Sequence, residues 1–410
     1  MSHNESVLAR LKPLIIPIYL PTLVYAAGGS IVVAVQVLLA LKLGLNEAGV
    51  ATLITVLGAI AILSSLVAGF IVQRFGEKRA VAGVSISGAA ILSIACGFIY
   101  WSNEHALWIF LGALVFFDVV DAVWAIARQG MVSDLAPADL RGRATNLYGA
   151  CQRIGRVFGP LFAAPFLLFF SPEWLLPIAG VIILSASGIL VRLSPLANKV
   201  EVQDVKATGQ TLDNEIAPTS VWKPFIFLGA GIMVLAMLRT SQSTLVQLWG
   251  KTGIDLADST LVLVLGLASA MELILFWPAG IVLDKWGRMP VIVTALVSMG
   301  LSMMVLPLNA TLAWYAIFSM TIGLGNGVGS GIIKTMGMDI APQMGRSTFF
   351  GRWQAIASTG ALLAPALSAV VMTHGSISLA LMVIGGIGML GAFWMAWWTP
   401  RFIPRVRRSG

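Results

Sequence analysis

The stretch Asp134-Leu135-Ala136-Pro137 and its second copy, Asp339-Ile340-Ala341-Pro342, decide the fold class of this 410-residue chain. Each copy is followed at the same distance by a proline, Pro160 after the first (134 to 160) and Pro365 after the second (339 to 365). A glycine precedes each of these prolines by five positions. Because the copies lie half a chain apart, the sequence predicts an internal duplication in which each half forms one structural unit.

A second motif repeats at nearly the same separation. It has a glycine, a polar residue four positions later and another glycine three positions after that. The two copies are Gly69, Gln73, Gly76 and Gly280, Asp284, Gly287. Two independent motifs therefore agree on the duplication.

The composition is that of a membrane protein. The chain is 58% hydrophobic and 11% charged, with a mean hydropathy of +0.90. Each of its apolar spans is long enough to cross a hydrocarbon core of roughly 30 Å as a helix. The spans are 13–41, 48–72, 80–101, 106–127, 145–170, 174–192, 224–248, 259–283, 290–308, 312–334, 347–372 and 376–398. We expect an all-α protein with twelve transmembrane helices in two six-helix bundles, 1–193 and 224–410, joined by a polar linker at 194–223.

Lysine and arginine fall almost entirely on one side of the predicted spans. With the N-terminus inside, only Lys42 and Lys251 lie in outer loops. The inner segments hold Arg10, Lys12, Arg74, Lys78, Arg79, Arg141, Arg143, Lys285, Arg288, Arg346, Arg401, Arg405, Arg407 and Arg408. This asymmetry predicts a multi-pass protein of the cytoplasmic membrane with both termini in the cytoplasm. It also accounts for the net charge of +8, so the lipid bilayer, and not nucleic acid, is the expected partner.

Other classes of site have no pattern in the sequence. No nucleotide-binding loop is present, and the three histidines (His3, His105 and His374) are too scattered to hold a metal ion. Cys96 and Cys151 lie singly inside spans, which does not indicate a disulfide framework. We therefore expect no cofactor, no metal and no enzymatic reaction, and we take a monomer as the default state.

The first copy of the glycine motif, Gly69-Phe70-Ile71-Val72-Gln73-Arg74-Phe75-Gly76-Glu77-Lys78-Arg79, resembles motif A of the major facilitator superfamily, and the second copy extends to Arg288. The resemblance covers essentially the whole chain. It implies that Gly69, Gln73, Arg74, Gly76, Gly280, Asp284, Gly287 and Arg288 help to lock the two bundles in the outward-facing state. The first copy departs from the family in having Gln73 in place of the usual aspartate, which weakens its charge lock.

The segment Gly155-Arg156-Val157-Phe158-Gly159-Pro160 resembles motif C, which is associated with proton-coupled exporters of the same superfamily. Ala163 and Ala164 depart from it, since the family often has glycines there. The resemblance implies a drug/proton antiporter. Close helix packing is an alternative explanation, because small residues allow two membrane helices to approach.

Two acids and two arginines lie inside consecutive spans of the first half. Asp118 and Asp121 share one helix face, and Arg153 and Arg156 share another. Each buried charge costs about 2.5–3.5 kcal/mol on the insertion scale, so a pairing of Asp121 with Arg153 and of Asp118 with Arg156 is expected to offset that cost. Two interpretations stay open: a static lock of the first bundle, or an aspartate that exchanges its arginine for a proton during transport.

The second half holds Glu272 near the middle of its eighth span and Arg239 on its seventh. Buried glutamates are suited to binding and releasing protons. Glu272 is therefore a candidate for proton coupling, with a static bridge to Arg239 as the alternative.

The resemblance also implies which residues face the central cavity, because spans 1, 4, 7 and 10 line it in this superfamily. The candidates are Tyr25, Gln36, Trp124, Arg239, Gln242 and Asn326. Helix packing is the alternative role for Tyr25 and Trp124. Alternating glycines from Gly323 to Gly331 predict a loosened tenth span.

The expected function is proton-coupled export of hydrophobic or amphipathic small molecules by alternating access. The first alternative is import of a small organic anion, with Arg156 and Arg239 as counter-charges. A second alternative is a lipid scramblase or a sensor that has lost transport.

Overall fold

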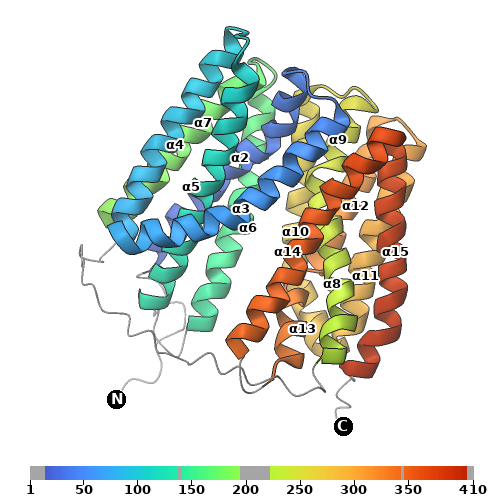
Figure 1. Cartoon of the computed structure of the whole chain (residues 1–410). Helices are drawn as coiled ribbons and strands as arrows, with labels where there is room; N and C mark the ends of the chain where they lie inside the picture. Colours follow the sequence, from blue (N-terminus) through green and yellow to red (C-terminus); the bar gives the residue numbers. More distant parts are fainter. Residues whose placement is uncertain (1–13, 136–140, 194–221, 343–345, 404–410) are drawn as a thin grey trace, which may run out of the picture. The chain divides into compact units, whose positions relative to one another are not determined.

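The structure is a computed structural model that describes residues 14–135, 141–193, 222–342 and 346–403 (Figure 1). All regular elements in these ranges are helices. The chain divides into two compact units, which hold the described residues of 1–44 with 56–203 and of 45–55 with 204–410. The predicted linker at 194–223 lies outside the described residues except for its last two positions.

The helices of the first half follow the predicted spans closely. They are η2 (Ile15–Tyr19), α2 (Leu20–Lys42), α3 (Glu47–Phe75), α4 (Glu77–Tyr100), α5 (Ala106–Leu135), α6 (Arg141–Phe166), η4 (Pro172–Trp174) and α7 (Leu175–Leu193). Within the first unit, α2 packs against α6 and α7, and α4 packs against α5 and α7.

The second half repeats this plan with two interrupted spans. Its helices are α8 (Trp222–Ser243), α9 (Leu245–Thr252), α10 (Asp258–Trp286), α11 (Arg288–Val305), η5 (Leu306–Leu308), α12 (Leu312–Val328), α13 (Ile332–Ile340), α14 (Arg346–His374) and α15 (Ile377–Phe402). Here α10 packs against α12, α11 packs against α12 and α15, and α8 packs against α14 and α15.

The expected all-helical membrane architecture is confirmed. Within the described ranges, eleven helical segments are long and apolar enough to cross a membrane. The segment that does not reach this threshold is α6, which carries Gln152, Arg153 and Arg156 along its length. These polar residues lower the mean hydropathy of α6, but its backbone is helical over Arg141–Phe166. The fifth predicted span is therefore present as a helix.

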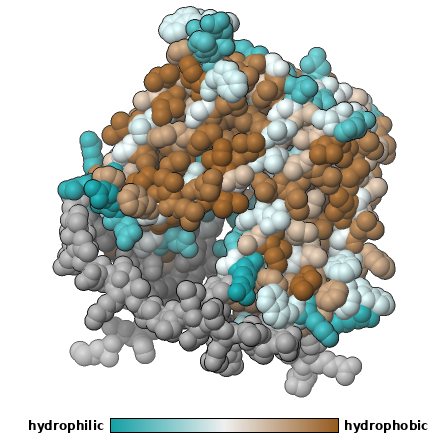
Figure 2. Space-filling view, viewed as in Figure 1, coloured by the Kyte–Doolittle hydropathy of each residue, from teal (hydrophilic) through white to brown (hydrophobic). Residues whose placement is uncertain are grey.

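Large apolar side chains remain exposed on the helices, as expected where lipid covers them. Leu66 on α3 is 73% exposed and Phe393 on α15 is 75% exposed. Apolar residues cover much of the visible helix surface in Figure 2. A soluble protein of this size rarely exposes so much contiguous apolar surface.

The glycines of the predicted motif C bring α6 against α2. A methyl group at Gly155 would meet the carbonyl oxygen of Leu23, and one at Gly159 would meet Ser30 and the carbonyl oxygen of Ala27. In the second unit Gly360 on α14 approaches the backbone of Met233 on α8 in the same manner. The duplicated glycine therefore has a packing role in both units.

The glycines of the predicted motif A form tight turns. Gly76 between α3 and α4 has a φ of +76°, and Gly287 between α10 and α11 has a φ of +87°. Residues with a side chain are disfavoured in this region, so both turns require glycine. A methyl group added at Gly69 would meet no atom within 4 Å, so packing does not explain the presence of this glycine.

Two spans of the second unit are interrupted, each nearer to its C-terminal end. The seventh span stops at Ser243 and resumes at Leu245, and the tenth stops at Val328 and resumes at Ile332. Gly331 adopts a left-handed conformation at the second break. The predicted loosening of the glycine-rich tenth span is thus a complete interruption of its helix.

Gly159→Val should destabilise the protein by about 1–3 kcal/mol, because the added side chain is forced into the backbone of α2. Gly149→Val on the same helix is the matched control, since a methyl group at Gly149 meets no atom within 4 Å. Thermal unfolding in detergent should show a lower Tm for the first variant than for the second. Equal Tm values would mean that the close approach of α6 and α2 carries no stability.

Candidate functional site

A polar cluster in the second unit joins three helices through the amide of Asn326. The Asn326 Nδ2 atom of α12 donates to Glu272 Oε2 of α10 at 2.9 Å and to Gln242 Oε1 of α8 at 3.1 Å. Gln242 is buried, whereas Glu272 and Asn326 are half-buried. The structure therefore brings together three residues that the sequence selects separately.

Arg239 satisfies the backbone at the break of the tenth span. Its Nη2 atom donates to the carbonyl oxygen of Gly329 at 2.7 Å. A break in a membrane helix leaves carbonyl groups without their usual partners, and lipid cannot supply them. The same carbonyl oxygen accepts from the backbone N of Ile332 at 3.2 Å, so Arg239 adds a second donor at the break, one helical turn from Asn326.

Both helix breaks lie next to this cluster. Gln242 is two residues before Thr244, where α8 gives way to α9, and Asn326 is two residues before the end of α12. Discontinuous membrane helices commonly surround the substrate and ion sites of transporters, because their free polar groups can reach a ligand. The geometry around Asn326 fits such a site.

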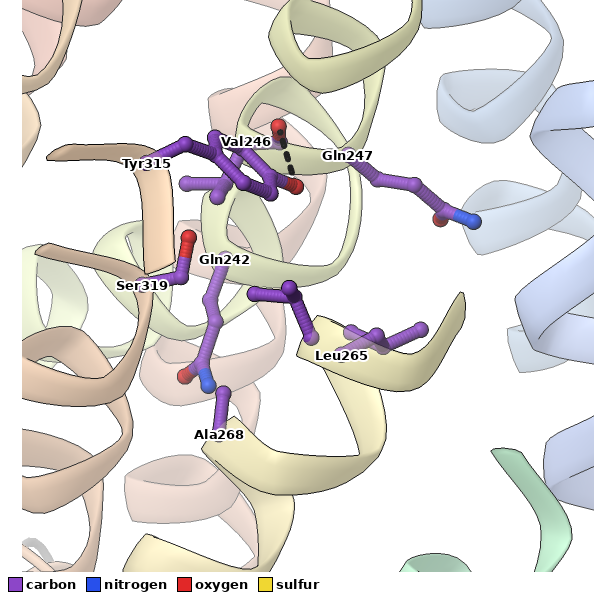
Figure 3. Close-up of a pocket in the computed structure, with 8 residues that line it drawn as sticks. Gln242, Val246, Gln247, Leu265, Ala268, Tyr315 and Ser319 are labelled. Atoms are coloured by element: carbon purple, nitrogen blue, oxygen red, sulfur yellow. Dashed lines mark hydrogen bonds between the residues drawn. The ribbon is translucent and has the colours of Figure 1, made fainter. Parts of the chain in front are cut away.

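A small pocket opens beside Gln242 (Figure 3). Its lining is mostly apolar and combines residues of α8, α9, α10 and α12. The lining residues are Gln242, Val246, Gln247, Val264, Leu265, Ala268, Tyr315 and Ser319. The hydroxyl of Tyr315 donates to the carbonyl oxygen of Val246 at 3.2 Å, which fixes the ring at the edge of the pocket.

In the first unit, the two candidate aspartates have different environments. Asp121 Oδ1 accepts a hydrogen bond of 3.0 Å from the hydroxyl of Tyr25 on α2. Asp118 Oδ2 is buried and has no hydrogen-bond partner within the part of the chain that the structure describes. No ion pair joins Asp118 to Arg156 in that part. Asp118 is therefore a carboxyl group whose buried oxygen is not matched by a donor.

The same unit contains an arginine inside a box of aromatic rings. Arg128 on α5 is only 2% exposed. Its guanidinium lies 4.6 Å from the ring centroid of Tyr25, 5.2 Å from that of Trp124 and 5.6 Å from that of Tyr148. Its Nε atom donates to the carbonyl oxygen of Trp124 at 3.0 Å. Ring faces attract a desolvated cation, so the box offsets the cost of burying Arg128.

Tyr25 and Trp124 are packed against each other. Their ring centroids are 4.3 Å apart in a stacked arrangement, and both side chains are buried, at 2% and 0% exposure. Trp124 Nε1 also donates to Ser85 Oγ on α4 at 2.9 Å. In this structure the two rings hold helices together and position Arg128.

The remaining candidates of the first unit lie on α2, α3 and α6. Gln36 is half-buried on α2, Arg153 is half-buried on α6, and Arg156 is exposed on the same helix. Gln73 and Arg74 are exposed near the end of α3. In the second unit, the side chain of Asp284 and the surroundings of Gly280 lie outside what the structure describes.

The second copies of the two repeated motifs meet through Arg288 and Asp339. Arg288 Nε donates to Asp339 Oδ2 at 2.7 Å, and Arg288 Nη2 donates to Asp339 Oδ1 at 3.2 Å. Arg288 Nη1 donates in addition to the carbonyl oxygen of Leu283 at 3.0 Å. This bidentate contact ties the turn between α10 and α11 to the end of α13.

Arg128, Tyr148 and Tyr315 were not predicted from the sequence. Arg128 lies at the end of a predicted span, where a cation is ordinary, and only the three-dimensional packing of three aromatic residues distinguishes it. A signal was nevertheless present, because Tyr25, Trp124 and Arg128 are all large residues in or beside spans that were expected to line one cavity. Within the described residues, no group of three or more His, Cys, Asp and Glu side chains is placed to hold a metal ion.

Tyr148→Leu should lower the stability of the protein by about 1–2 kcal/mol, because Arg128 loses one ring face in a desolvated site. Tyr148→Phe retains the ring and is the matched control. Thermal unfolding in detergent should give a Tm close to that of the wild type for the Phe variant and a lower one for the Leu variant. An equal loss in both variants would assign the effect to the hydroxyl group.

Comparison with known proteins gives a consistent family. The model of the Major Facilitator Superfamily matches residues 19–351 and also 228–409. Two curated relatives match part of the chain. Probable anion transporter 4, chloroplastic, of Arabidopsis thaliana is 27% identical over 174 residues, covering 40% of this chain and 32% of that protein. A Na(+), Li(+), K(+)/H(+) antiporter of Planococcus maritimus is 28% identical over 152 residues, covering 37% and 34%. The matches thus span about a third of each relative.

Solved structures match the fold over nearly the whole chain. A POT family transporter in complex with 5-aminolevulinic acid has a TM-score of 0.73 at 12% identity and covers 96% of both chains. A D-xylose-proton symporter has a TM-score of 0.72 at 13% identity and covers 97% of this chain and 100% of its own. At this identity the likeness shows the fold alone. From the family match and the helical architecture together, the chain is a member of the major facilitator superfamily, a secondary active membrane transporter and not an enzyme.

Proposed function

We propose that this transporter couples proton movement to the export of hydrophobic or amphipathic small molecules. The observation that carries the proposal is the shared amide of Asn326, which bonds both the Glu272 carboxylate and the pocket residue Gln242. Glu272 can take a proton, and Gln242 can contact a substrate in the pocket. The side chain of Asn326 links these two residues. Such proximity is what an exchange of proton for substrate requires.

Asp118 supports the same mechanism from the first unit. A buried carboxylate oxygen without a donor is costly as an anion, and protonation removes most of that cost. Asp121, by contrast, receives the Tyr25 hydroxyl as a donor. Of the two aspartates, Asp118 is therefore the better proton site. Glu272 is the first candidate for coupling and Asp118 the second.

The lining of the pocket supports the proposed substrate class. At about 10 Å³ the pocket has room for about one water molecule, so a substrate would have to part the lining side chains in order to enter. Val246, Val264, Leu265 and Ala268 supply apolar surface, and the polar lining residues are Gln242, Gln247, Tyr315 and Ser319. Pockets of this composition hold mainly apolar compounds that carry one or two polar groups. This chemistry favours lipophilic or amphipathic compounds over sugars or other strongly hydrated ones.

Export, membrane placement and organisation belong to the same proposal. Motif C and the partial similarity to a cation/proton antiporter favour antiport. The bias of lysine and arginine favours the cytoplasmic membrane, with both termini in the cytoplasm. The bundles at 1–193 and 224–410 with a linker at 194–223 would then rock about the substrate site, and a monomer suffices for this cycle.

Purified protein in liposomes with an internal pH dye tests the proposal. Lipophilic cations and organic anions are supplied in turn under an imposed proton gradient. We expect proton flux that depends on the lipophilic compound and runs opposite to it. Glu272→Gln should abolish this coupled flux, because the amide cannot take a proton.

Glu104→Gln is the matched control, since Glu104 lies in a loop between α4 and α5 and its side chain is 84% exposed. Flux that survives Glu272→Gln but is lost in Asp118→Asn would retain proton coupling and move the proton site to the first unit. Absence of proton movement with every compound of the panel would refute the proposal.

Transport of a small organic anion is the second candidate, and Arg128 is the observation that favours it. The Nη1 atom of this buried guanidinium has no hydrogen-bond partner within the described residues. A buried donor of this kind is suited to a carboxylate, with which arginine forms strong charge-assisted bonds. The partial similarity to an anion transporter is consistent with this alternative.

Uptake of radiolabelled benzoate into proteoliposomes distinguishes the two candidates. An anion transporter should accumulate benzoate, and Arg128→Gln should lose that uptake because no cation remains to pair with the carboxylate. Arg192→Gln, at the exposed end of α7, is the control. No benzoate uptake by the wild type would exclude this candidate.

A further inference from the structure

We propose that Asn326 is a positioning residue that reverses the hydrogen-bonding polarity of Gln242 when Glu272 gains or loses a proton. The proposal rests on the proton-coupled function above and deepens it. It assigns to one amide the step by which protonation of Glu272 is transmitted to the substrate pocket. All three residues belong to the second unit, so the device is complete within it.

The contact geometry defines the starting state. One atom, Asn326 Nδ2, lies between Glu272 Oε2 at 2.9 Å and Gln242 Oε1 at 3.1 Å. A primary amide nitrogen carries two hydrogens, so both bonds form at once. Both acceptors must then present oxygen, which is the arrangement that suits an ionised Glu272.

The orientation of Gln242 follows from that state. Since its Oε1 atom accepts from Asn326, its amino group forms the other end of the amide. Figure 3 shows the Gln242 side chain directed toward Ala268, on the pocket lining. With Glu272 ionised, Gln242 therefore offers the pocket a hydrogen-bond donor, which suits a substrate that carries a carbonyl or ether oxygen.

Protonation of Glu272 inverts this chain of bonds. The protonated carboxyl group gains an O–H donor, while its carbonyl oxygen remains an acceptor. In the protonated state that the proposal assigns, the O–H of Glu272 donates to Asn326, whose Oδ1 atom then faces it. Asn326 reaches this state by a half-turn of its amide. Gln242 then faces an acceptor, so its own amide turns to donate Nε2, and its Oε1 atom becomes the group offered to the pocket.

The half-turns need little space. The oxygen and nitrogen of a side-chain amide have nearly the same size, so a turned amide keeps its outline. Backbone packing meanwhile holds the two helices in place, because a methyl group at Gly327 would meet the backbone of Glu272. The cluster can therefore change its hydrogen-bond directions while α10 and α12 keep their separation.

Three cations on the helices packed around Glu272 or next to them either bond another acid or lie exposed, namely Lys251, Arg288 and Lys334. The described part of α12 carries no charged residue between Leu312 and Val328. On α9, Lys251 bonds Asp258 at 2.6 Å, and on α11, Arg288 bonds Asp339. Lys334 on α13 is exposed. Arg239 on α8 remains the nearby cation, and its bond to the Gly329 carbonyl places it one turn from Asn326.

Infrared difference spectroscopy of the full-length protein in lipid tests the inference. Spectra recorded at acidic and alkaline pH are subtracted. We expect a carboxyl band from Glu272 together with side-chain amide bands from Asn326 and Gln242. Glu272→Gln should lose the carboxyl band and the amide bands together. Without a group at position 272 that gains or loses a proton, a change of pH does not turn the amides of Asn326 and Gln242.

Gln242→Leu should keep the carboxyl band and lose only part of the amide signal. Gln247→Leu is the matched control, since it removes a glutamine from the same pocket outside the bonded chain, and it should keep both signals. Asn326→Leu should lose all of the amide signal. If that variant does not fold, the Glu272 and Gln242 variants are sufficient to carry the test.

A carboxyl band that disappears in Glu272→Gln, with no amide bands in the wild type, would overturn the relay and leave proton coupling intact. Amide bands that persist in Glu272→Gln would overturn the relay as well. Absence of any carboxyl band assignable to Glu272 would instead refute Glu272 as the proton site of the proposed function, and the relay with it. The failures of the two proposals are therefore distinguishable.

Discussion

Hydrocarbon offers no hydrogen bonds, and this constraint determines how the polar groups of this transporter are arranged. At the break after α12, the carbonyl oxygen of Gly329 accepts from the backbone N of Ile332 and from Arg239. The same arginine would be costly in the membrane without such a partner. The glycine run, the break and the half-buried Arg239 thus lie together, and the polar cluster around Asn326 forms beside them.

The two units meet the constraint in different ways. In the second unit, the amide of Asn326 donates to the carboxylate of Glu272, and the amide of Gln242 lines a pocket. In the first unit, aromatic ring faces surround the guanidinium of Arg128, and hydrogen bonds are few. Bonded amides can reverse direction at low cost, whereas stacked rings hold one arrangement. This difference supports a mobile proton site in the second unit and a fixed charge in the first.

Much of the architecture could be predicted from the sequence, because apolar length and internal repetition are local properties. The positions of the apolar spans and the tight turns at Gly76 and Gly287 follow from such patterns. The glycine run predicted a loosened tenth span, but not the interruption of its helix or that of the seventh span. The site was harder to predict. Asp118, Glu272 and Asn326 were identifiable as costly or polar residues, but their partners depend on helix rotation. Arg128 was missed because its burial comes from Tyr25 and Tyr148, which are distant in the sequence.

In the proposed cycle, a proton and a substrate compete through Glu272. Proton release on substrate binding, recorded with a pH indicator in weakly buffered detergent solution, tests this competition most directly. The added compound is the one that drives proton flux in liposomes. The wild type should release protons as the compound binds, and Glu272→Gln should bind the compound with no release. Equal proton release by the two proteins would contradict the competition at Glu272.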